Sequence, residues 1–129
     1  LERGRIDVSG DFGWVMGDEV LLRQALSNLM RNSIEACSAN GIEPQVRVEG
    51  AAEAPHARIT IEDNGPGIPP ESLLRIFKPF VTTKAQGTGL GLAIVQKVIV
   101  SHTGRIVAAN RTSGGAQFRI QLPLATSAR

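Results

Sequence analysis

A segment rich in glycine, proline and threonine, residues 63–88, divides the chain into two parts that are each patterned for regular structure. A loop this long inside a compact domain is usually functional. We expect it to contain one helical turn, near residues 71–76. The sheet and the long helices must then come from the parts on either side.

The order of the patterned stretches predicts an α+β fold with two layers. Helical periodicity covers residues 18–38 and 90–102, and alternation of apolar and polar residues marks the strands. The expected strands are a short pair at 5–9 and 14–16, a hairpin of 46–49 with 57–62, and a hairpin of 105–110 with 116–122. Because hairpin strands pair antiparallel, this order predicts a two-layer α/β sandwich with a mixed, mostly antiparallel sheet and the helices on one face.

The composition fits a single domain over residues 1–129, with 42% apolar and 20% charged residues. No apolar run approaches the ~18 to 20 residues that span a bilayer. The single cysteine, Cys37, cannot form an internal disulfide, and the two histidines are too far apart for a zinc motif, which predicts a cytosolic setting. The chain starts at Leu1 without a signal-peptide pattern, so we expect a fragment of a longer protein.

Charge is distributed unevenly along the chain. Residues 1–70 contain six basic and eleven acidic side chains, whereas residues 71–129 contain eight basic and one acidic. Either the two halves lie side by side and their fields cancel, or the basic half surrounds an anion. The net charge of +2 is too small to predict direct nucleic-acid binding.

The first helical pattern carries amides on the side opposite its apolar stripe. Asn28, Asn32 and Glu35 share one face. This face could simply be solvated, but asparagine is a poor helix former, and two at i and i+4 are an unusual choice for that purpose. Their carboxamide oxygens could instead hold Mg²⁺. The opposite, core-facing stripe comprises Leu22, Leu26, Leu29, Met30, Ser33 and Cys37.

The sequence DNGPG begins the long segment at Asp63. Asp63 shares its parity with Ile59 and Ile61, so its carboxylate is expected on the buried face, where it needs a donor. A ligand amino group or a neighbouring backbone N–H would serve. Gly65 and Gly67 allow positive φ or the close approach of a flat ligand, and an ordinary Asx turn with glycines is the alternative.

Three glycines at alternate positions, Gly87, Gly89 and Gly91, open the second helical pattern. Free N–H groups at a helix start bind anions, so these glycines indicate a backbone that approaches phosphate closely. Shortly before them, Thr82, Thr83 and Lys84 add hydroxyls and a cation. No strand directly precedes the glycines, which disfavours a Rossmann site, and there is no Walker loop. Between the two glycine-rich stretches lies the sequence IFKPF, whose aromatic rings either anchor the loop or latch a lid.

Together these stretches resemble, in order, the conserved boxes of sensor histidine kinases. NLMRN resembles the N box, DNGPG the first glycine box, IFKPF the F box and GTGLGLAIV the second glycine box. The resemblance implies the Bergerat ATP-binding fold, and the details look most like the nitrogen-, oxygen- and metal-responsive subgroup. Ser33 departs from the family pattern, in which alanine is more usual at this position.

The resemblance also implies a site for ATP and Mg²⁺. Asp63 would bind the adenine amino group, Asn32 would ligate Mg²⁺, and Asn28 and Lys84 would lie near the polyphosphate as catalytic residues. The implied nucleotide-binding residues are Asn32, Asp63, Gly65, Gly67, Ile68, Phe80, Thr83, Lys84, Gly87, Thr88, Gly89, Leu90 and Gly91.

The expected activity is transfer of the ATP γ-phosphoryl group to a histidine. ATPases of this fold carry a glutamate base four residues before the Mg²⁺ asparagine, and here that position is Asn28, which cannot activate water. The resemblance implies an upstream dimerisation and phosphoacceptor domain, a response regulator as partner, a monomeric isolated domain and a homodimeric full-length kinase that is either cytoplasmic throughout or anchored to a membrane. The alternatives are a degenerate nucleotide-binding docking module and a serine kinase or ATPase of the same fold.

Overall fold

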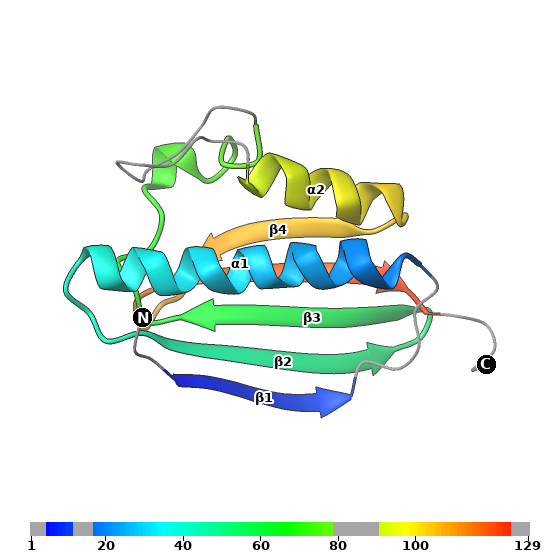
Figure 1. The fold of residues 1–129 in the computed structure, drawn as a ribbon, viewed down its shortest axis with the longest axis horizontal. Coiled ribbons are helices and arrows are strands. Elements are labelled where there is room, and N and C mark those ends of the chain that lie inside the picture. The colour runs from blue at the N-terminus through cyan, green and yellow to red at the C-terminus, as the bar shows by residue number, and fades with distance from the viewer. Residues whose placement is uncertain (1–4, 12–16, 79–90, 125–129) are drawn as a thin grey trace.

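The computed structural model describes residues 5–11, 17–78 and 91–124 (Figure 1). Two α-helices and a short 3-10 helix accompany a five-stranded sheet in the described parts of the chain. The strands are β1 (Arg5–Asp11), β2 (Gln45–Glu53), β3 (His56–Asp63), β4 (Arg105–Asn110) and β5 (Ala116–Pro123). The helices are α1 (Glu19–Ala39) and α2 (Gly91–Ser101), and the 3-10 helix is η1 (Pro70–Ser72).

The sheet has the strand order β1-β2-β3-β5-β4. β1 pairs parallel with β2, and every other pair is antiparallel, which confirms the predicted mixed, mostly antiparallel sheet. Both expected hairpins are present as β2–β3 and β4–β5. The partner that the structure gives to β1 is β2, whereas residues 14–16, the expected partner, lie outside the described residues. The parallel pairing requires a crossover, which α1 supplies.

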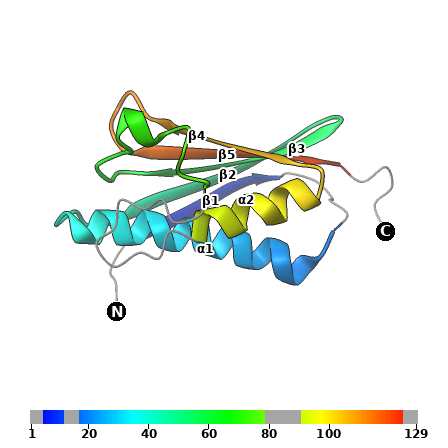
Figure 2. The ribbon, with the colours of Figure 1, turned by 90° about the horizontal axis from the view of Figure 1, so that it is seen from above.

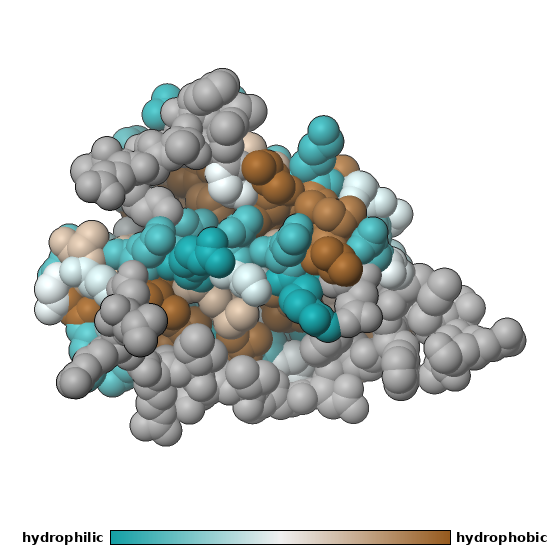
Figure 3. Space-filling view, in the orientation of Figure 1, coloured by the Kyte–Doolittle hydropathy of each residue, from teal (hydrophilic) through white to brown (hydrophobic). Residues whose placement is uncertain are grey.

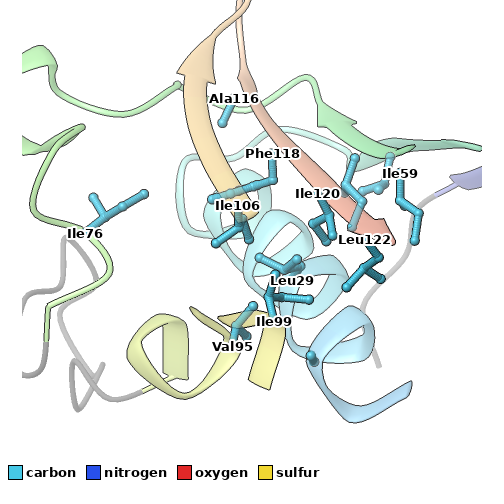
Figure 4. Close-up of a cluster of buried hydrophobic side chains, with 13 residues drawn as sticks. Leu29, Ile59, Ile76, Val95, Ile99, Ile106, Ala116, Phe118, Ile120 and Leu122 are labelled. Atoms are coloured by element: carbon cyan, nitrogen blue, oxygen red, sulfur yellow. The ribbon is translucent and has the colours of Figure 1, made fainter. Parts of the chain in front are cut away.

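Both long helices cover the same face of the sheet, as predicted (Figure 2). A row of α1 residues spaced four apart faces inward and is buried, because positions four apart share one face of a helix. The row consists of Ala25, Leu29, Ser33 and Cys37, with the predicted Leu22, Leu26 and Met30 partly buried beside it. Alternate residues of β3 and β5 meet this row together with Val95 and Ile99 of α2 (Figure 4).

The ends of α1 follow from local chemistry. Asp18 is the N-cap, and its side chain accepts a hydrogen bond from the N–H of Leu21 at 3.1 Å, which satisfies one free donor of the first turn. At the other end Gly41 adopts φ +70°, a conformation that favours glycine after a helix. The helix predicted over 18–38 is therefore confirmed almost to the residue.

His102 ties the end of α2 to the start of α1. Its Nδ1 lies 2.8 Å from the carbonyl oxygen of Val98, so this nitrogen donates, and its Nε2 accepts from the N–H of Asp18 at 3.0 Å. This histidine therefore has a structural role where the two helices meet.

Apolar side chains remain exposed on the helical side of the molecule. Ile94 and Val100 of α2 are more than half exposed, and hydrophobic surface gathers where α2 runs (Figure 3). Among the described residues, none of the helices combines the length and apolar character required to cross a lipid bilayer.

Candidate functional site

The carboxylate of Asp63 lies at the end of β3, on the helical face of the sheet. It is buried, as its parity with Ile59 and Ile61 predicts. Its Oδ1 accepts two backbone hydrogen bonds, from Gly65 N–H at 2.9 Å and from Ala116 N–H at 3.0 Å. Of the two kinds of donor that the sequence left open, backbone N–H groups are therefore present. Within the described ranges no hydrogen bond reaches the second oxygen, Oδ2, so it remains an acceptor for a further donor.

The glycines of DNGPG are required by the packing of the protein itself. A Cβ on Gly65 would lie 3.1 Å from Asp63 Oδ1 and 3.3 Å from the sulfur of Cys37. Gly67 has φ +83°, and a Cβ there would lie 2.9 Å from Asn110 Oδ1. Tight packing thus accounts for both glycines, and their contact with a bound nucleotide remains a prediction.

Asn64 fastens the same loop to the connection between α1 and β2. Its Oδ1 accepts from the N–H of Gln45 at 2.8 Å and from the thiol of Cys37 at 3.2 Å, and its Nδ2 donates to the carbonyl of Glu43 at 3.1 Å. Sequence reasoning missed this residue. The signal available was its place beside Asp63 in a turn, where asparagine commonly bonds backbone.

Cys37 of α1 packs against the loop at Asn64 and Gly65. It is fully buried, and burial raises the pKa of its thiol; the nearby Asp63 carboxylate raises the pKa further, against smaller opposing hydrogen bonds from Gln45 and Asn64. The thiol is therefore a neutral packing group that donates one hydrogen bond at neutral pH.

A second set of residues that sequence reasoning missed comes from the turn between β4 and β5. Asn110 and Ile68 exchange two hydrogen bonds, and Arg111 donates through Nη1 to the carbonyl oxygen of Asp63 at 2.7 Å. Gly115 is buried with φ +95°, and a Cβ there would lie 1.9 Å from the same carbonyl oxygen. No local sequence signal links this turn to a loop more than 40 residues earlier.

The remaining predicted residues divide into two groups. Asn28 and Asn32 are half-buried on α1, outside its buried row, and Gly91 is the first residue of α2, where a Cβ would meet no atom within 4 Å. In the described parts of the chain no three His, Cys, Asp or Glu side chains gather as a metal site, so the carboxamides remain the metal-ligand candidates there. Outside the described residues lie Phe80, Thr83, Lys84, Gly87, Thr88, Gly89 and Leu90.

A one-sided, mixed sheet with a buried aspartate beside a glycine-rich loop is the architecture of ATP-binding α/β sandwiches. The family described as "Histidine kinase-, DNA gyrase B-, and HSP90-like ATPase" matches residues 17–126. The chain belongs to this family.

Within this family, the following similar proteins are kinases. Sporulation kinase C of Bacillus subtilis (strain 168) is 39% identical over 110 residues, which are 85% of this chain and 25% of that protein. A mycobacterial sensor histidine kinase, MprB, superposes with a TM-score of 0.81 at 30% identity, covering 92% of this chain and 82% of that chain. The histidine kinase ThkA, solved in complex with the response regulator protein TrrA, gives a TM-score of 0.76 at 31% identity over 96% of this chain and 35% of that chain. The chain thus spans about a quarter of the curated relative's length.

Proposed function

We propose that this chain is the catalytic, ATP-binding domain of a protein-histidine kinase. In this proposal it binds ATP with Mg²⁺ and transfers the γ-phosphoryl group to a histidine on a dimerisation domain of the same protein. The phosphorylated histidine then passes the group to an aspartate of a response regulator. Family membership and the similarity to sensor histidine kinases support the proposal.

The observation that carries it is the carboxylate of Asp63. Oδ1 is held in place by two backbone N–H groups, while Oδ2 has no donor among the described residues. An adenine amino group is a donor and would bond to this second oxygen. Guanine presents a carbonyl oxygen at the corresponding position, so it would leave Oδ2 without a donor and would be rejected.

Among the described residues, those proposed to bind the phosphates and the metal lie on the helices. Asn32 and Asn28 supply carboxamide oxygens, which suit Mg²⁺, and Mg²⁺ when bound would neutralise charge on the phosphates. Gly91 begins α2, where free N–H groups favour an anion, and among the described residues a Cβ at Gly91 would meet no atom within 4 Å. Lys84, Thr83 and the remaining second-box glycines complete this set in the proposal.

Asn28 favours a histidine over water as the acceptor. A carboxamide has no basicity near neutral pH, so a residue at this position can orient a nucleophile but cannot deprotonate water. A histidine side chain is already a nucleophile when neutral and needs placement in line with the γ-phosphorus. The acceptor domain is proposed to lie in the remainder of the longer protein.

The experiment is incubation of the chain with γ-labelled ATP and Mg²⁺, with and without a separately supplied dimerisation domain that carries the acceptor histidine. We expect slow, acid-labile and base-stable labelling of the added domain, and no rapid hydrolysis, because the tether that raises effective concentration is absent. Acid-stable label on Ser or Thr would contradict the proposal. ATP binding without transfer to a cognate acceptor would favour a docking module instead.

A further inference from the structure

The β4–β5 turn, together with the strand residues Asn110 and Ala116 on either side of it, forms hydrogen bonds with both ends of the loop of residues 63–68. At the far end, the N–H of Ile68 donates to Asn110 Oδ1 at 2.7 Å, and Asn110 Nδ2 donates to the carbonyl oxygen of Ile68 at 2.7 Å. One side chain therefore satisfies both backbone groups of one residue. Such a reciprocal pair fixes the position and the orientation of that peptide segment.

At the near end the contacts converge on Asp63. Arg111 Nη1 donates to its carbonyl oxygen at 2.7 Å, and the N–H of Ala116 donates to its carboxylate at 3.0 Å. Gly115 lies against the same carbonyl, so closely that no side chain fits between them. The backbone of Asp63 is thus held by the turn, and its side chain by Ala116, the first residue of β5.

The turn is itself ordered by internal hydrogen bonds. The N–H of Arg111 donates to the carbonyl of Gly115 at 2.9 Å, and the N–H of Gly114 donates to the carbonyl of Arg111 at 3.1 Å. It closes the β4–β5 hairpin, whose strand β5 pairs with β3. A preformed turn of this kind can hold a glycine-rich loop that would otherwise have many conformations.

We propose that Asn110 and Arg111 are positioning residues for the base-binding side of the nucleotide site, although neither belongs to the four sequence boxes. They hold the loop so that the free oxygen of Asp63 points consistently at the bound base. The inference rests on the proposed function, because it assumes that a nucleotide binds at Asp63. It adds the turn as a distinct determinant of affinity for the base, separate from the groups that bind phosphate.

The test compares ADP with inorganic tripolyphosphate in calorimetric titrations of the 129-residue chain. Asn110→Leu and Arg111→Met keep the approximate shape of each side chain but remove its hydrogen bonds to the loop. We expect each substitution to lower the affinity for ADP about tenfold, which corresponds to a fall of the binding-competent loop population to about a tenth. The affinity for tripolyphosphate should stay within about twofold of wild type. Arg111→Lys keeps one donor for the Asp63 carbonyl and should restore most of the ADP affinity. Ser113→Ala, exposed in the same turn, is the matched control and should change neither ligand.

Hydrogen exchange provides a readout that needs no ligand. In Arg111→Met the amide of Gly65 should exchange faster, whereas the amides of Ile59 and Ile61 in β3 should not change. Equal weakening of both ligands, or unchanged ADP affinity together with unchanged exchange at Gly65, would overturn the inference while leaving the proposed function intact. A wild-type chain that binds no ADP would instead overturn both.

Discussion

Replacing Asp63 with asparagine exchanges Oδ2 for an amide nitrogen and leaves Oδ1 available to Gly65 and Ala116. The fold should therefore survive, but a donor would face the adenine amino group where an acceptor is needed. We expect ADP affinity to fall about a hundredfold or more, because the amide N–H and the adenine amino group would face each other as two donors without an acceptor. Calorimetry measures the loss, and the thermal midpoint checks the fold. An affinity within about threefold of wild type, at an unchanged midpoint, would remove Asp63 from the site.

Ser33 is a second residue with a local consequence. Its hydroxyl is buried in the inward row of α1 and has no hydrogen-bond partner among the described residues. Ser33→Ala should raise the free energy of unfolding by about 1 kcal/mol, because it removes an unsatisfied buried polar group. Urea unfolding measures this gain. Ser27→Ala, half-buried on the same helix, controls for helix propensity, and an equal gain there would show that burial of the hydroxyl is not the cause.

The thiol of Cys37 predicts how stability depends on pH. Because burial raises the pKa of this thiol, the folded chain retains its proton at a pH where the unfolded chain has lost it. The contribution is therefore fully present below the unfolded pKa of about 8.5 and is lost as pH rises toward the folded value, with a slope of at most about 1.4 kcal/mol per pH unit.

The measurement is urea unfolding at two pH values, about 7.5 and about 9.5, which lie roughly one unit on each side of the unfolded thiol pKa. The wild type should lose more stability than Cys37→Ala between the two conditions, since other titrating groups are common to both chains. Identical losses would show that the thiol ionises in the folded state as readily as in the unfolded one.

At the scale of elements, the β4–β5 turn contains two adjacent glycines with positive φ in very different surroundings. Gly114 has φ +101° and faces open space, whereas Gly115 has φ +95° and lies against the Asp63 carbonyl. Gly114→Ala should cost about 1 kcal/mol for backbone strain alone. Gly115→Ala should cost about 3 kcal/mol or more, because either the turn or the loop has to move. Chemical denaturation compares the two, and equal costs would show that the close approach is not needed.

The elements show what sequence reasoning can reach. Periodicity predicted α1, its buried row and both hairpins, because these depend on contacts between residues close in sequence. Alternation along β3 also predicted that the Asp63 carboxylate is buried. The parallel pairing of β1 with β2 was not predicted, since it depends on how α1 crosses between them.

The contacts around the loop of residues 63–68 could not be predicted from local sequence patterns either. The reciprocal bonds of Asn110 and the donation by Arg111 join segments that meet only when β3 and β5 pair. From the sequence alone, Asn110 cannot be told from an asparagine in an ordinary turn. The predicted roles of Asn28, Asn32 and the second glycine box depend on a bound nucleotide, and they stay predictions.

At the scale of the whole molecule, a ligand that binds only the folded chain raises its stability by mass action. ADP at about 100 times its dissociation constant should add roughly 2.7 kcal/mol, and this gain should appear as a higher thermal midpoint. A titration of the midpoint against ADP concentration checks the expectation. Asp63→Asn serves as the control, and a midpoint that rises equally in that variant would place the binding elsewhere.

The pairing of β3 with β5 has a consequence for how the protein is assembled during synthesis. β3 precedes the long segment and β5 follows it, so the two strands that meet beside Asp63 are synthesised at different times. Until Ala116 arrives, the carboxylate of Asp63 lacks one of its two backbone donors. A nascent chain that ends before β5 therefore lacks part of the proposed base-binding site. Under the proposed function, nucleotide binding at Asp63 marks finished folding, and it stabilises the chain only after its C-terminal hairpin has joined the sheet.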